Sequence, residues 1–422
     1  MFLTNRRRLL QAGAAAVAVV AMPSIVRSAN TARVVVIGGG FGGATAAKYL
    51  RQGDPSLHVT LVQRDARFVT CPFSNLVLGG LRDINDIAHG YDALRGKHGI
   101  DVVIDEAVSV DPGKRTVALQ GGGTLEYDRL VLSPGIDLRY DALEGYDEAA
   151  ARVMPHAWQA GPQTTLLRSQ IEAMPDGGLV LICPPANPFR CPPGPYERAS
   201  MIAHYLKTNK PKSKIMILDS KGNFSKQGLF TKAWQELYPG MIEWLPAEGG
   251  GKVLRADPGA LGVETDFGLQ KGNVVNVIPP QRAGRIAQLA GCTDDSGWCP
   301  VDTNTFESKL QPGIHVIGDA SVASPMPKSA TAANSQAKAA AAAIVALLKG
   351  DPVTAATLAN TCYSLVAPDQ GISVTTVYAN GGEGLEETGG GLSPLDASEG
   401  ERQLEAAYTE GWYRGITLDA FG

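Results

Sequence analysis

The chain has 422 residues, of which 44% are hydrophobic and 19% are charged, and it contains 49 glycines. This length and composition are sufficient for two or three folded domains with apolar cores and exclude a wholly disordered chain. The formal net charge is −4 at pH 7, which does not suit a nucleic-acid-binding surface. The six cysteines follow neither a zinc-ligand spacing nor that of a disulfide-rich domain, so we expect no metal site.

The first 29 residues have the composition of an export signal. They contain Arg6–Arg8, then the apolar run Leu9–Met22, and the small residues Ser28 and Ala29 suit a cleavage site. The run is too short to anchor the chain in a membrane, and no later stretch is apolar enough to span one. The paired arginines before Leu-Leu resemble a twin-arginine signal, with an ordinary secretory signal as the alternative. We predict that residues 1–29 direct the mature chain to the periplasm.

Residues 32–53 read as a β-branched strand, a glycine-rich turn and a helix. The glycines of this turn have the spacing G-x-G-x-x-G and stand at Gly38, Gly40 and Gly43. In a dinucleotide site they permit a tight turn, close approach of the pyrophosphate, and close packing of helix on strand. An acidic residue about twenty residues further on usually binds the ribose. Gln63 stands there, at the end of the predicted strand 57–65, so an amide replaces the usual carboxylate.

Two later motifs distinguish FAD from NAD as the dinucleotide. One predicted strand ends at Ser133 and Gly135, and a later one ends at Gly318 and Asp319. This succession of motifs is typical of flavoproteins with two dinucleotide-binding folds, in which the aspartate binds the ribityl chain of FAD. We therefore expect FAD as the cofactor.

The order of these motifs predicts an α/β fold. It has two Rossmann-like domains of the dinucleotide-binding type, one of them degenerate, followed by a C-terminal α+β region. The FAD-binding domain is expected at residues 30–140 and 281–350, and the degenerate NAD-type domain at residues 141–280. Residues 351–422 are expected to form a C-terminal interface domain.

The second domain should carry its own nucleotide-binding turn, between a predicted strand at 177–183 and a predicted helix at 198–207. A turn that holds phosphate needs glycines and free backbone N–H groups. This connection instead contains Cys191 and is rich in proline, which has no N–H group to donate. The prolines stand at positions 184, 185, 188, 192, 193 and 195. We interpret the domain as degenerate and expect that it binds no nicotinamide nucleotide.

The cysteines allow more than one reading. Cys71 stands alone where related disulfide reductases have two cysteines near the flavin, so it is either an attachment point for the flavin or a buried free thiol. Export leads to an oxidising compartment, in which a disulfide persists. Cys191 and Cys362 are therefore either a redox pair or a structural disulfide. Cys292 and Cys299 either form a local disulfide or stay reduced.

Longer segments carry a more specific resemblance. They include IAHGYDALR (87–95), PHAWQAGPQT (155–164), FRCPPGPYERAS (189–200), ILDSKGNFSKQGLF (217–230) and NTCYS (360–364). From about residue 32 to its end, the chain resembles the flavoprotein subunit of flavocytochrome c sulfide dehydrogenase.

This resemblance implies roles for several residues. The cysteine that matches Cys71 carries FAD through a thioether, and those that match Cys191 and Cys362 form a disulfide over the flavin. Glu197 is a candidate acid or base, with a carboxylate that only complements the helix dipole as the alternative. From its position after the Gly-Asp turn, Lys328 is expected to place positive charge near the pyrimidine end of the flavin, or else to be a solvated loop lysine.

The resemblance also implies a reaction. Sulfide opens the disulfide, sulfane sulfur or polysulfide is released, and electrons pass through FAD to haem on a c-type cytochrome partner. The chain has no C-x-x-C-H sequence, so a c-type haem must belong to that partner. The alternatives are a sulfide:quinone oxidoreductase and a non-catalytic accessory flavoprotein of a sulfur-oxidising complex. Residues 380–422 are acidic and glycine-rich, which favours a soluble partner.

Overall fold

The computed structural model of the chain describes residues 31–382 and 384–422, and Ala32–Gly422 form one compact unit. The predicted export signal at residues 1–29 lies outside the described residues and stays a prediction. Within the described part, no helix has both the length and the apolar character needed to cross a membrane.

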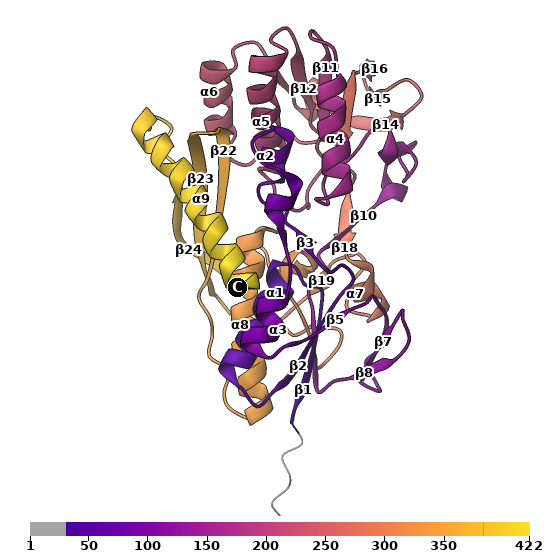
Figure 1. Cartoon of the computed structure of the whole chain (residues 1–422), viewed down its shortest axis with the longest axis vertical. Helices are drawn as coiled ribbons and strands as arrows, with labels where there is room; N and C mark the ends of the chain where they lie inside the picture. The colour runs from indigo at the N-terminus through magenta and orange to yellow at the C-terminus, as the bar shows by residue number, and fades with distance from the viewer. Residues whose placement is uncertain (1–30, 383) are drawn as a thin grey trace, which may run out of the picture. The chain divides into compact units, whose positions relative to one another are not determined.

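The first domain is built on a five-stranded parallel sheet with the strand order β20-β9-β1-β2-β5, of which β1, β2 and β5 are labelled in Figure 1. The strands are β1 (Arg33–Ile37), β2 (His58–Gln63), β5 (Asp101–Ile104), β9 (Arg129–Leu132) and β20 (Ile314–Val316). The sequence of β1 is RVVVI, and its last four residues are buried. Such β-branched runs suit a parallel strand that is covered on both faces. Because β20 comes from far along the chain, two separate stretches build this domain.

Two helices with many small residues pack against each other beside this sheet. They are α1 (Phe41–Gly53) and α8 (Ala330–Lys349). The Ser329 side chain caps α8 by accepting from the amide of Ala332 at 3.0 Å, and Gly350 ends it with φ +76°. Serine at the start and glycine at the end are the favoured helix caps.

The second domain has a four-stranded parallel sheet with the order β13-β12-β11-β17. The strands are β11 (Leu179–Cys183), β12 (Lys214–Leu218), β13 (Ile242–Leu245) and β17 (Val274–Val277), and the helices are α4 (Pro162–Ala173), α5 (Gly194–Asn209) and α6 (Gln227–Leu237). Helix α5 begins four residues before the predicted start at 198. Pro195 lies in its first turn, where a missing N–H costs nothing.

The chain passes between the two domains twice, and the two passages are paired. Strand β10 (Ile136–Leu138) runs antiparallel to β18 (Gln281–Ala283), with Asp137 opposite Arg282. The passages therefore lie side by side next to the turn that contains Cys191, where Gln281 accepts a hydrogen bond from the amide of Arg190.

The C-terminal part is an antiparallel sheet covered by one long helix (Figure 1). Its elements are β22 (Leu358–Ala367), β23 (Gln370–Asn380), β24 (Leu385–Leu392) and α9 (Glu399–Phe421). The ring of Phe421, at the end of α9, stacks on His89 at 5.1 Å and lies 5.7 Å from Phe41. These contacts tie the C-terminal helix to the first domain. The predicted fold class, with two parallel-sheet domains and a C-terminal α+β region, is confirmed.

Candidate active site

Cys191 lies in the turn between β11 and α5 and has a left-handed backbone conformation, with φ +56°. Few residues other than glycine adopt this conformation, so neighbouring groups must hold it. The amide of Cys191 donates to the carbonyl of Lys328 at 2.8 Å, and the amide of Gly194 donates to the carbonyl of Cys191 at 2.8 Å. A Cβ on Gly194 would lie 3.0 Å from Cys191 Sγ. The turn thus fixes the backbone of the cysteine and leaves space for its sulfur.

Two other cysteines and a carboxylate lie near Cys191. Burial raises the pKa of the Cys191 thiol above its usual range, and negative charge on Cys362, Glu197 and Cys71 raises it further. Such an effect falls off with distance, so these groups belong to the neighbourhood of Cys191. Cys71 Sγ lies 3.6 Å from the carbonyl oxygen of Trp158. All three cysteines are thiols in the structure, so their disulfide and the flavin linkage stay predictions.

Cys362 lies in β22 and contacts side chains from several elements. The Asn360 amide donates from Nδ2 to Cys362 Sγ at 3.3 Å, and the Ser329 hydroxyl donates to Asn360 Oδ1 at 2.5 Å. Lys226 Nζ donates to the carbonyl of Cys362 and to Ser364 Oγ, each at 2.8 Å. Burial lowers the pKa of the Lys226 ammonium to about 8. A polar donor and a buried cation therefore lie beside Cys362.

Glu197, in the first turn of α5, connects the neighbourhoods of Cys71 and Cys362. Its carboxylate accepts from Asn75 Nδ2 at 2.7 Å and from the amide of Leu365 at 2.9 Å. Asn75 Oδ1 accepts from the buried Arg198 at 3.2 Å, which fixes the direction of the amide. Burial raises the pKa of Glu197, although both hydrogen bonds act to lower it. Glu197 thus lies at a helix N-terminus, where a carboxylate complements the helix dipole, and also near the cysteines, where it can act as an acid or base. Both alternatives for its role are compatible with this position.

Arg190 organises a group of buried polar atoms that lack partners. Its guanidinium donates to the carbonyl of Trp158 and lies 3.7 Å from the carboxylate of Asp319, and its amide donates to Gln281 at 2.9 Å. The side chains of these three neighbours each have one buried atom without a hydrogen bond: Trp158 Nε1, Gln281 Nε2 and Asp319 Oδ1. Buried polar atoms are almost always hydrogen-bonded. Two donors and an acceptor fit the ring heteroatoms and ribityl hydroxyls of a flavin.

The glycine turn between β1 and α1 has the geometry expected for pyrophosphate. Gly38 has φ +98°, and a Cβ on it would lie 2.3 Å from the carbonyl oxygen of Ser133. A Cβ on Gly43 would lie 1.8 Å from the carbonyl oxygen of Gly38. Gly40 caps α1, so the free amides of the first helical turn follow it, where a phosphate binds. The side-chain oxygen Oε1 of Gln63 accepts from the amide of Gly39 at 2.7 Å, so this side chain supports the turn, and its contact with a ribose stays a prediction.

The other two FAD motifs meet this turn at the ends of the strands. A Cβ on Gly42, in the first turn of α1, would lie 2.5 Å from Ser133 Oγ, and one on Gly318 would lie 3.6 Å from the same oxygen. Gly135 and Gly318 both have positive φ, at +66° and +72°. The three separate sequence motifs thus form one site, with Asp319 directly after Gly318.

Lys328 is not a solvated loop lysine. Its ammonium donates to the carbonyls of Asp319 and Ser321, each at 2.8 Å, and lies 3.8 Å from the centre of the Trp298 ring. Burial lowers its pKa to about 8. Its position relative to the pyrimidine ring of a flavin stays a prediction.

The nucleotide end of the second domain is filled by its own side chains. Asp219, at the end of β12, would be the ribose ligand of an NAD site. It is fully buried and accepts from the Tyr196 hydroxyl at 2.5 Å, from Trp244 Nε1 at 2.9 Å and from Lys221 at 2.5 Å. The ring of Tyr196 stacks on Phe224 at 3.7 Å. The carboxylate is therefore engaged inside the protein.

Sequence reasoning missed four side chains that shape the site: Asn75, Arg190, Lys226 and Asn360. Arg190 is next to Cys191, and Asn360 lies two residues before Cys362, on the same face of the strand. This proximity in sequence is a signal that could have identified both. Asn75 and Lys226 reach the site only through the fold.

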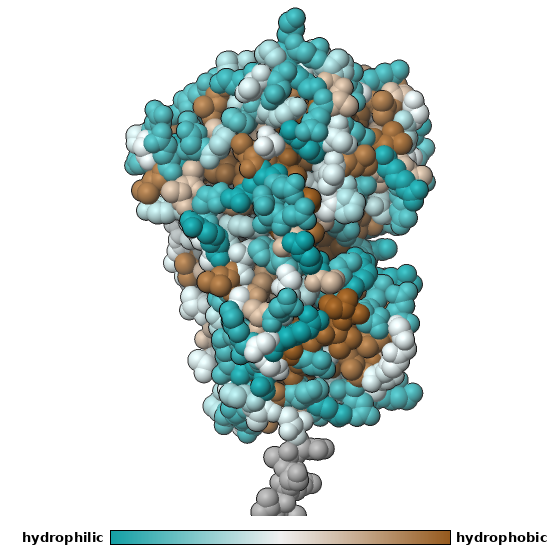
Figure 2. Space-filling model, in the orientation of Figure 1, coloured by the Kyte–Doolittle hydropathy of each residue, from teal (hydrophilic) through white to brown (hydrophobic). Residues whose placement is uncertain are grey.

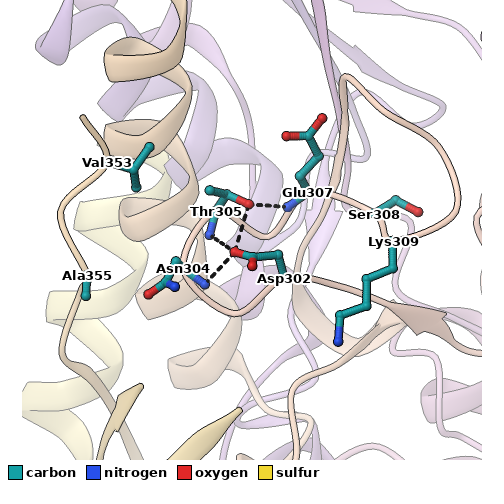
Figure 3. Close-up of a pocket in the computed structure, with 8 residues that line it drawn as sticks. All are labelled: Asp302, Asn304, Thr305, Glu307, Ser308, Lys309, Val353 and Ala355. Atoms are coloured by element: carbon teal, nitrogen blue, oxygen red, sulfur yellow. Dashed lines mark hydrogen bonds between the residues drawn. The ribbon is translucent and has the colours of Figure 1, made fainter. Parts of the chain in front are cut away.

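A separate surface hollow of about 490 Å³ lies between residues 302–309 and the segment at 353–355 (Figure 3). The carboxylate of Asp302 accepts there from the amides of Asn304 and Thr305, each at 2.9 Å. These bonds shape a loop, and the lining includes none of the residues predicted for the flavin or sulfur chemistry.

Family models match three parts of the chain. Residues 164–279 match the central region of the sulfide dehydrogenase [flavocytochrome c] flavoprotein chain, and residues 354–421 match the flavin-binding region of flavocytochrome c sulphide dehydrogenase. Residues 32–161 match the pyridine nucleotide-disulphide oxidoreductase model.

Individual relatives agree with these matches. The chain is 70% identical over 48 residues to the sulfide dehydrogenase [flavocytochrome c] flavoprotein chain of Chlorobaculum thiosulfatiphilum, covering 11% of this chain and 100% of that sequence. It is 33% identical over 184 residues to the sulfide-quinone reductase of Aquifex aeolicus, covering 43% of this chain and 41% of that protein.

A solved structure supports the fold. The sulfide:quinone oxidoreductase from Aquifex aeolicus superposes with a TM-score of 0.72 at 20% identity, covering 92% of each chain. The three matched regions and the short, highly similar relative show that the chain belongs to the family of flavocytochrome c sulfide dehydrogenase flavoprotein chains, which are oxidoreductases.

Proposed function

We propose that this chain is the flavoprotein subunit of a periplasmic sulfide dehydrogenase. It oxidises sulfide to sulfane sulfur or polysulfide and passes the electrons through FAD to a c-type cytochrome. The observation that carries this proposal is that Glu197, on the helix that follows Cys191, is hydrogen-bonded to Asn75 near Cys71 and to Leu365 near Cys362, next to buried polar atoms that suit a flavin. The names of the relatives, which refer to sulfide, flavin and cytochrome c, support the same reading.

The first step of the proposed reaction uses the chain's own sulfur atoms. With Cys191 and Cys362 joined as a disulfide, hydrosulfide attacks one sulfur and the other cysteine leaves as a thiolate. The substrate sulfur is oxidised by two electrons and becomes the outer atom of a persulfide, while the electron pair remains on the thiolate. Glu197 is positioned to hold a proton during this exchange, because its carboxylate lies beside both cysteines and burial raises its pKa.

Residues from both parts of the first domain would hold FAD. The turn with Gly38 and Gly40 suits the pyrophosphate, Gln63 suits the ribose, and Asp319 suits the ribityl hydroxyls. When bound, FAD supplies an acceptor that takes electrons in pairs and releases them singly. Single-electron release suits a haem partner, and this chain has no C-x-x-C-H sequence to bind haem itself.

Co-purification tests this function directly. We expect the chain, purified from its natural host, to carry a c-type cytochrome whose haem is reduced on addition of sulfide. A purified flavoprotein that reduces a quinone with sulfide, but no cytochrome, would contradict the proposal. A complex that binds cytochrome without sulfide turnover would instead indicate an accessory role.

The quinone alternative has one structural observation in its favour. Helix α9 exposes Leu404, Tyr408 and Leu418, and Figure 2 shows apolar residues among hydrophilic ones on the face that carries this helix. An apolar C-terminal helix face is a feature that a membrane-facing enzyme needs. Comparing decylubiquinone and cytochrome c as acceptors in the same sulfide assay distinguishes the two functions.

Covalent flavin attachment is expected at Cys71, because this lone cysteine lies close to Cys191 and to the carbonyl of Trp158. Acid precipitation of the loaded protein should leave flavin on the pellet, and Cys71→Ala should release it into the supernatant. The variant should fold, since the pyrophosphate turn is formed by other residues. Yellow colour in the supernatant of the wild-type protein would disprove the linkage.

NADH is expected not to reduce the flavin. The turn before α5 lacks phosphate-binding glycines, and Asp219 is engaged by Tyr196, Trp244 and Lys221. Anaerobic mixing with micromolar NADH should leave the flavin absorbance unchanged, while sulfide should bleach it. Rapid bleaching by NADH would show that the second domain still binds a nicotinamide nucleotide.

A further inference from the structure

The two cysteines of the proposed redox pair have different surroundings. Asn360 is 2% exposed, and its Nδ2 lies 3.3 Å from Cys362 Sγ. The two residues are separated by one position in β22, so their side chains lie on the same face of the strand. An N–H group that points at sulfur favours the charged form, the thiolate, over the neutral thiol.

Ser329 fixes the direction in which the Asn360 amide points. The oxygen of the Ser329 hydroxyl accepts from the amide of Ala332 at the start of α8, so its proton is available for a second bond. That proton is donated to Asn360 Oδ1 at 2.5 Å. With its oxygen held by Ser329, the amide presents its NH2 group to Cys362.

Lys226 adds a buried positive charge next to Cys362 and Ser364 in β22. Its Nζ lies 2.8 Å from both the carbonyl oxygen of Cys362 and Ser364 Oγ. Among the described residues this ammonium forms no ion pair, and Glu197 and Glu405 act on it only through space. Burial lowers the pKa of Lys226 to about 8, and the proximity of Cys362 opposes that shift. The charge is thus available to stabilise a thiolate on Cys362.

Cys191 has weaker support, since the charge of Cys362 acts more strongly on the Lys226 ammonium than that of Cys191 does. In the part of the chain that the structure describes, no group forms a hydrogen bond with its sulfur, and only its backbone is held. Burial raises the pKa of its thiol. Arg190 acts in the opposite direction, but its guanidinium is directed to the carbonyl of Trp158 and to Asp319.

We infer that Asn360 and Lys226 give the disulfide a fixed polarity, so that hydrosulfide attacks Sγ of Cys191 and Cys362 is the leaving thiolate. This inference rests on the proposed function. A bond forms between the substrate sulfur and Cys191 Sγ, and the bond between Cys191 and Cys362 breaks. Cys362 keeps the electron pair, and the proton of hydrosulfide stays on the new persulfide. A better-stabilised thiolate leaves faster, so Asn360, Lys226 and Ser329 act as positioning residues.

A quench experiment on the wild-type enzyme tests the polarity. Oxidised protein is mixed anaerobically with one equivalent of sulfide, quenched within milliseconds by an excess of iodoacetamide, digested with trypsin and analysed by mass spectrometry. Cleavage after Arg190 and Arg198 isolates the Cys191 peptide, and cleavage after Lys349 and Arg402 isolates the Cys362 peptide. We expect an extra sulfur atom on the Cys191 peptide and simple alkylation of Cys362.

The other outcomes separate the two proposals. An extra sulfur on the Cys362 peptide would overturn the polarity and leave the proposed function standing. If neither peptide gained sulfur, sulfide would not open the disulfide at all, and both the function and the polarity would be wrong.

A matched pair of variants tests the contribution of Asn360. Asn360→Asp removes the donor with almost no change in shape, and it should slow disulfide opening by roughly 10- to 100-fold, the worth of one hydrogen bond to a charged group. It should also move part of the extra sulfur to Cys362. Asn380→Asp makes the same change in β23, where the amide donates to Thr303, and should leave both readouts at wild-type values. Wild-type rate and labelling in folded Asn360→Asp would contradict the inference.

Discussion

Replacing Cys191 or Cys362 with serine is expected to reduce sulfide oxidation by several orders of magnitude without unfolding the protein. Serine preserves the backbone bonds that fix each position, from Cys191 to Lys328 and from Lys226 to Cys362. It cannot form a disulfide or a persulfide, so the covalent route is lost. Each variant should still bind FAD, because the glycine turn and Asp319 are unchanged.

The competing explanation for this pair is a structural disulfide. A bond of that kind stabilises a protein by about 2–4 kcal/mol and leaves the flavin chemistry intact. Steady-state sulfide oxidation, FAD content and melting temperature should be measured for each variant beside Cys292→Ala, which removes a buried thiol outside the site. Variants that melt at a lower temperature but keep the wild-type rate would identify the bond as structural.

Glu197→Gln is expected to lower the rate of sulfide oxidation by roughly 10²–10⁴-fold, the usual range for loss of a general acid or base. Glutamine keeps the size of the side chain but cannot exchange a proton. The Asn75 NH2 group and the amide of Leu365 both donate to the carboxylate of Glu197. Glutamine has only one acceptor oxygen for these two donors. Glu236→Gln changes an exposed carboxylate on α6 that pairs with Lys232 and should leave the rate unchanged.

The pH profile distinguishes proton transfer from a structural role of Glu197. Because burial raises its pKa, the ionised base is lost at a higher pH than for a surface glutamate as the solution is acidified. The wild-type rate should therefore fall on the acid side at a pH above the ordinary glutamate value, and Glu197→Gln should lack this limb. The same acid limb in both proteins would assign the proton transfer to another group.

The motifs that could be read from the sequence are those that local geometry requires. Gly38 needs a positive φ and Gly43 has no space for a Cβ, so both positions are visible as glycines. The prolines before α5 similarly indicate that this turn does not bind phosphate. The predicted start of this helix at residue 198 is nevertheless too late, because Pro195 fits the first turn of α5 and the helix begins at Gly194.

The parts that could not be predicted depend on packing between distant segments. Lys226 and Cys362 are 136 residues apart and meet only when β22 packs against the second domain. Asn75 reaches Glu197 across 122 residues. The sequence predicts that Gln63 binds a ribose, but it does not predict the hydrogen bond between the Gln63 side chain and the amide of Gly39. That bond depends on how the glycine turn lies against the end of β2. Side chains of these types are common on surfaces, so nothing in their local sequence distinguishes them.

Anaerobic stopped-flow reduction of the flavin by sulfide shows directly whether sulfide must open the disulfide between Cys191 and Cys362 before the flavin is reduced. The wild-type protein and the two variants Cys191→Ser and Cys362→Ser should be compared at equal FAD loading. We expect rapid bleaching in the wild-type protein and reduction slower by several orders of magnitude in both variants. Near-wild-type bleaching in either folded, FAD-loaded variant would contradict this expectation, because sulfide would then reduce the flavin without opening a disulfide.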